Sequence, residues 1–113
     1  MTIRAWLRSR TPPAPAPLLA RLEAALGPAL DDDASSAPAR LLDAAVELLR
    51  PLVARDDAGR DCALDLLAAD ALVTYAFEAA SDDVDSLDGL THDAMRRLAS
   101  LAPDGNAVRH ARG

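Results

Sequence analysis

The segment from Ala63 to Ala80 limits what this chain can fold into more than any other stretch. Its sequence, ALDLLAADALVTYAFEAA, consists mostly of Ala and Leu, which favour helices because they lose little side-chain freedom there. On a helical wheel its apolar side chains spread over most of the circumference. A helix of this kind lies in the middle of a bundle or packs against a second subunit. The segment therefore predicts a helix, over about residues 60–80, that needs more cover than an ordinary surface helix.

The composition of the whole chain favours an all-α fold. Half of the 113 residues are hydrophobic, but only one Phe, one Trp and one Tyr are present. The residues that strands favour, β-branched and aromatic, are therefore few beside Ala and Leu. A chain of this length buries roughly 60–70% of the surface that its unfolded form exposes. We therefore expect one helical bundle domain with a core of its own.

The first 16 residues are expected to form an arm outside this domain. They contain a short basic segment, MTIRAWLRSR, and most of a proline-rich linker, TPPAPAP, which is extended because proline fixes φ and lacks an N–H. A short helix is then expected from about Pro17 to Leu26, because Gly27 and Pro28 stop it. The bundle domain is predicted over residues 17–103, and residues 104–113 are expected to form a flexible tail.

Three principal helices are predicted after the short one, at about residues 38–55, 60–80 and 86–102. The first two are expected to run antiparallel because the turn between them, RDDAGRD, is short. Pro51 falls inside the first principal helix and either kinks or divides it. Asp85 is the expected N-cap of the last one.

Charge and cysteine content exclude several classes of protein. The net charge of −6 argues against nucleic acid as the main partner, because an acidic surface repels phosphates. Cys62 is the only cysteine, so it forms no intramolecular disulfide and does not build a zinc site alone. A reducing, cytoplasmic setting is therefore expected. The sequence has no run of about 18 uncharged apolar residues, and no transmembrane helix is predicted.

Asp70, Thr74 and Glu78 follow one another at intervals of four and form a narrow polar stripe on the 60–80 helix. One interpretation is that the stripe faces solvent or pairs with Arg from a neighbouring helix. The other is an acidic groove that binds a metal or a cationic partner. The two carboxylates stand ~12 Å apart along the helix axis, too far to share one metal without other ligands. We therefore predict no metal site and no cofactor.

No pattern of catalytic residues is present. A nucleophile needs a base or a lowered pKa, and Cys62 has Asp61 and Asp65 beside it, which oppose thiolate formation. The chain has no nucleophile elbow, P-loop or dinucleotide-binding glycine pattern. We therefore predict no catalytic residue and a protein that is not an enzyme.

The stretch AADALVTYAFEAASD, residues 68–82, resembles the GDALLTLAFE type of helix in isoprenyl diphosphate synthases. The resemblance covers only this stretch of the chain. Ala69 stands where that family has glycine, and the paired DDxxD motifs of the family do not occur in this sequence. No active-site residue is therefore carried over to this chain.

Arg4, Trp6 and Arg8 give the N-terminal arm the composition of a docking element. A Trp among Arg residues lies on an anionic membrane surface as a peripheral contact, or fits a groove on a protein partner. The remaining interpretation is that Trp6, the largest side chain of the protein, folds back onto its own core.

Together these features favour a non-catalytic helical interaction module, either an adaptor, a regulator or a structural accessory protein. It is expected to act through its apolar helix faces, as a homodimer or in a complex with another protein. One alternative is a small metal- or cation-binding helical protein or enzyme that uses the stripe of Asp70 and Glu78. The other is a peripheral docking protein that uses Arg4, Trp6 and Arg8.

Overall fold

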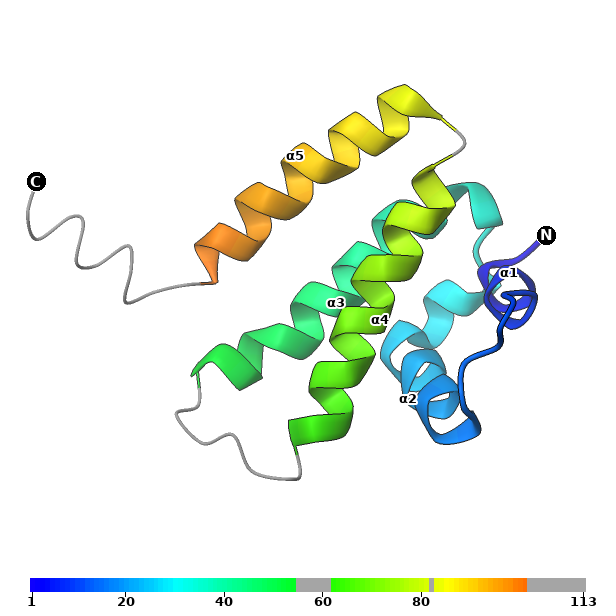
Figure 1. Ribbon diagram of the computed structural model, residues 1–113, viewed down its shortest axis with the longest axis horizontal. Helices are drawn as coiled ribbons and strands as arrows, with labels where there is room; N and C mark the ends of the chain where they lie inside the picture. Colours follow the sequence, from blue (N-terminus) through cyan, green and yellow to red (C-terminus); the bar gives the residue numbers. More distant parts are fainter. Residues whose placement is uncertain (55–61, 82, 102–113) are drawn as a thin grey trace, which may run out of the picture.

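The computed structural model describes residues 1–54, 62–81 and 83–101 (Figure 1). These residues contain helices and no strand; their only β-type pairing is one isolated bridge between Thr2 and Asp33. The prediction of an all-α fold is therefore confirmed. The α-helices are α1 (Ile3–Arg8), α2 (Ala16–Leu26), α3 (Ala37–Ala54), α4 (Ala63–Ala80) and α5 (Val84–Ser100), and two short 3₁₀-helices, Gly27–Asp31 and Ala34–Ser36, connect α2 to α3.

The helices form close to where the sequence predicts them. Pro51 lies inside α3, which continues past it to Ala54, so the proline does not divide the helix. Gly27 ends α2 with a φ of +54°, a conformation that glycine adopts without steric cost. The expected turn at residues 55–61 and the expected tail at 104–113 lie outside the described residues.

The N-cap of α5 is Asp83 and not Asp85. The Asp83 carboxylate accepts hydrogen bonds from the Asp85 backbone N–H, at 3.1 Å, and from the Ser86 hydroxyl, at 2.9 Å. These bonds favour the charged carboxylate and hold the pKa of Asp83 below its ordinary value. The sequence prediction was wrong because several aspartates precede this helix, and residue type alone does not select among them.

The core lies mainly between α3 and α4, which run antiparallel and side by side (Figure 1). Figure 1 also shows α1 and α2 on one side of this pair and α5 on the other. From its start near the end of α4, α5 runs at an angle to α4, so the two helices separate toward the start of α4. The largest fully buried side chains are Ile3, Leu22, Leu41, Leu42, Val46 and Leu72.

The first ten residues are attached to the rest of the fold. Ile3 and Leu7 are buried and belong to the core cluster. The Ile3 N–H donates to the Asp32 carbonyl at 2.9 Å, and the Ala34 N–H donates to the Met1 carbonyl at 2.8 Å. Apolar burial and backbone hydrogen bonds therefore both hold the arm against the helices.

Candidate functional site

Three leucines near the start of α4 are exposed. Leu64 is 40% exposed, Leu66 46% and Leu67 52%. The following turns of the same helix carry the buried residues Ala68 and Leu72, which pack in the core. We call Leu64, Leu66 and Leu67 the α4 apolar surface. Because neighbouring large apolar side chains at a surface mark interaction sites more often than isolated ones do, this surface is the leading candidate for function.

A groove adjoins the α4 apolar surface where α4 and α5 have separated. It has a volume of about 300 Å³. Among its lining residues one side chain is charged, and the others are apolar. We call it the α4–α5 groove; its lining residues are Leu49 of α3, Leu66, Ala69, Asp70 and Val73 of α4, and Leu98 of α5.

Asp70 is the charged group of this groove. Its side chain forms no ion pair with any described residue, and its backbone carbonyl accepts a hydrogen bond from the Thr74 hydroxyl at 2.9 Å. Asp65, on the same helix, instead pairs with Arg21 of α2 at 2.6 Å. The groove therefore presents an apolar lining with one negative charge at its edge, a combination suited to an apolar partner that brings positive charge.

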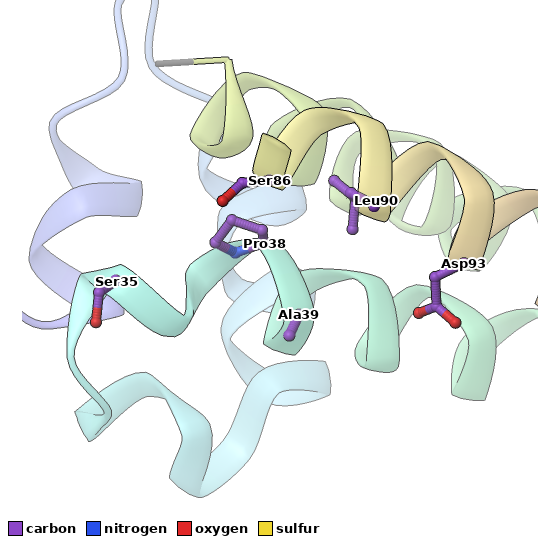
Figure 2. Close-up of a pocket in the computed structure, with 7 residues that line it drawn as sticks. Ser35, Pro38, Ala39, Ser86, Leu90 and Asp93 are labelled. Carbon is purple, nitrogen blue, oxygen red and sulfur yellow. The ribbon is translucent and has the colours of Figure 1, made fainter. Parts of the chain in front are cut away.

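A second depression lies between the start of α3 and the first half of α5 (Figure 2). Its volume is about 330 Å³, and its lining includes Ser35, Ser86 and Asp93. Two of these polar groups are already engaged, since the Ser86 hydroxyl donates to Asp83 and Asp93 pairs with Arg96 and Arg97. Its one charged side chain, Asp93, is therefore already paired, whereas Asp70 of the α4–α5 groove forms no ion pair with a described residue.

The structure separates the members of the predicted acidic stripe. Asp70 lies at the groove, whereas Glu78 forms an ion pair with Arg10 of the arm at 3.3 Å. Thr74 uses its hydroxyl within the helix. His92 is exposed on α5. Within residues 1–54, 62–81 and 83–101, no three His, Cys, Asp or Glu side chains gather in a way that would hold a metal ion.

The predicted docking residues of the arm contact the protein itself. Arg4 pairs with Asp31 at 2.6 Å, and Arg8 pairs with Glu23 at 2.8 Å. The hydrogen bond from Arg8 holds the pKa of Glu23 below its ordinary value. Trp6 packs edge-on against another aromatic ring, that of Tyr75, with ring centroids 6.2 Å apart.

The Arg10 guanidinium lies over the Trp6 ring, 4.1 Å from its centroid, and so covers the indole from a second side. The described part of the chain includes no helix with the length and hydrophobicity needed to cross a bilayer.

Sequence reasoning did not find the groove. Leu49 and Leu98 repeat with other leucines at helical spacing on α3 and α5, a pattern typical of core residues. The periodic pattern shows that each helix has an apolar face, but it does not show the angle at which two helices diverge. The excess of apolar residues in the 60–80 segment was the one sequence signal for an exposed apolar surface. It did not indicate which end of the helix is exposed.

No protein-family model, no curated protein and no solved structure matches this chain significantly. No family match therefore supports the resemblance of residues 68–82 to a helix of isoprenyl diphosphate synthases. A function for this chain has to follow from its own geometry and chemistry.

Proposed function

We propose that this protein is a non-catalytic helical interaction module, an adaptor, regulatory or structural accessory protein. Its docking surface consists of the α4 apolar surface and the adjoining α4–α5 groove. The observation that carries the proposal is the exposure of Leu64, Leu66 and Leu67 on a helix whose other face packs in the core. Leu66 belongs to both the surface and the groove, so a partner element that enters the groove also covers Leu66.

Covering this surface contributes favourable free energy to association. Fully burying a leucine side chain contributes roughly 1.5–3 kcal/mol. The three leucines are already about half buried, so covering them completely contributes a part of that value for each. Filling the groove adds contacts with Leu49 and Leu98. A partner with its own apolar face gains a comparable amount, which offsets the entropy lost on association.

A helix is the element that best fits this surface. The groove lies between α4 and α5, and helices pack by placing their side chains between those of a neighbouring helix. An amphipathic helix therefore places its apolar side chains against Leu66 and Leu98. We propose a second copy of this chain or another protein as its source, and a reducing, cytoplasmic setting that agrees with the single buried thiol of Cys62.

The two alternative functions have less support. A metal- or cation-binding stripe needs Asp70 and Glu78 to act together, but Glu78 is paired with Arg10. A docking arm needs Arg4, Trp6 and Arg8 to face a partner, whereas all three contact the protein's own helices or loops.

Co-purification from the native cell tests the proposal. Full-length tagged protein is compared with Leu66→Asp, which places a charge in the groove, and with Ala24→Asp, which places the same charge on the exposed side of α2. We expect the wild type and Ala24→Asp to recover a partner, either another protein or an untagged copy of this chain. Leu66→Asp is expected to lose that partner. Circular dichroism verifies that both variants stay helical. Recovery that does not depend on Leu66, or no specific recovery at all, would contradict the proposal.

A further inference from the structure

We draw no further inference here: the strongest candidate, the exposed apolar surface of Leu64, Leu66 and Leu67 near the start of α4, belongs to the docking surface already proposed, and nothing in the described residues shows what covers it.

Discussion

The two halves of α4 have nearly the same apolar composition but opposite environments. In the second half, residues 72–80, Tyr75 packs against Trp6, and Glu78 pairs with Arg10. In the first half, residues 63–71, Leu66 and Leu67 are about half exposed. The N-terminal arm reaches only the second half, and α5 separates from α4 toward the first half (Figure 1). Different segments therefore cover different parts of this apolar helix, and its surplus surface remains where no other part of the described residues covers it.

The largest effect is expected from a matched pair of leucine truncations on the two faces of α4. Leu72→Ala should destabilise the protein by about 2–5 kcal/mol, because Leu72 is completely buried and its removal leaves a cavity. Leu67→Ala should cost less than about 0.5 kcal/mol in dilute solution, since exposed sites tolerate substitution. Urea unfolding of both variants provides the measurement. Equal losses would mean that the first half of α4 is covered after all.

Removal of the arm's main contact should have the next largest effect. Trp6→Ala is expected to reduce the free energy of unfolding by about 2 kcal/mol, because it removes the contact with Tyr75 and the stacking of Arg10 on the indole. Trp6→Phe should retain part of this energy and serves as the conservative control. Chemical denaturation gives both values. A loss below about 0.5 kcal/mol for Trp6→Ala would show that the arm does not stabilise the second half of α4.

A smaller effect of opposite sign is expected in α5, the helix that leaves the first half of α4 uncovered. Gly89→Ala should stabilise the protein by about 0.5–1 kcal/mol, because an added Cβ meets no atom within 4 Å and alanine restricts the unfolded chain. Gly27→Ala is the contrasting variant. It should destabilise, because the φ of +54° at Gly27 strains any residue with a Cβ. Thermal unfolding measures both changes, and a destabilising Gly89→Ala would mean that α5 packs more closely than described.

The smallest effect concerns pH and the ion pair that fastens the arm to α2. The Arg8 guanidinium lowers the folded-state pKa of Glu23 below its ordinary value of 4.5. This contribution to stability is therefore complete above pH 4.5 and is lost as the pH falls through the lowered pKa.

Stability measured from about pH 7 to about pH 3 should therefore decline less steeply in Glu23→Gln than in the wild type. Arg8→Gln should flatten the curve to a similar degree, because the interaction needs both partners. Identical slopes in all three proteins would show that the Arg8–Glu23 ion pair does not stabilise the arm.

Local signals in the sequence predicted most of the helices. The features that they did not predict depend on contacts between residues far apart in the chain. Proline, glycine and leucine spacing placed α2 through α5 to within a few residues, because these signals act between neighbours in the chain. The contact of Arg10 with Glu78 spans 68 residues, and no local pattern encodes it. For the same reason the excess of apolar residues in α4 was visible in the sequence, but the exposure of Leu64, Leu66 and Leu67 was not.

The docking of the arm onto α4 has a consequence for the order of events during synthesis. The ribosome makes the arm before α4, and Glu78, with which Arg10 pairs, follows Arg10 by 68 residues. Closing so long a loop is slow compared with forming the α3–α4 hairpin. Until Tyr75 has been made, the nascent chain lacks the ring that packs against the Trp6 indole, so the arm exposes an aromatic surface that chaperones can bind.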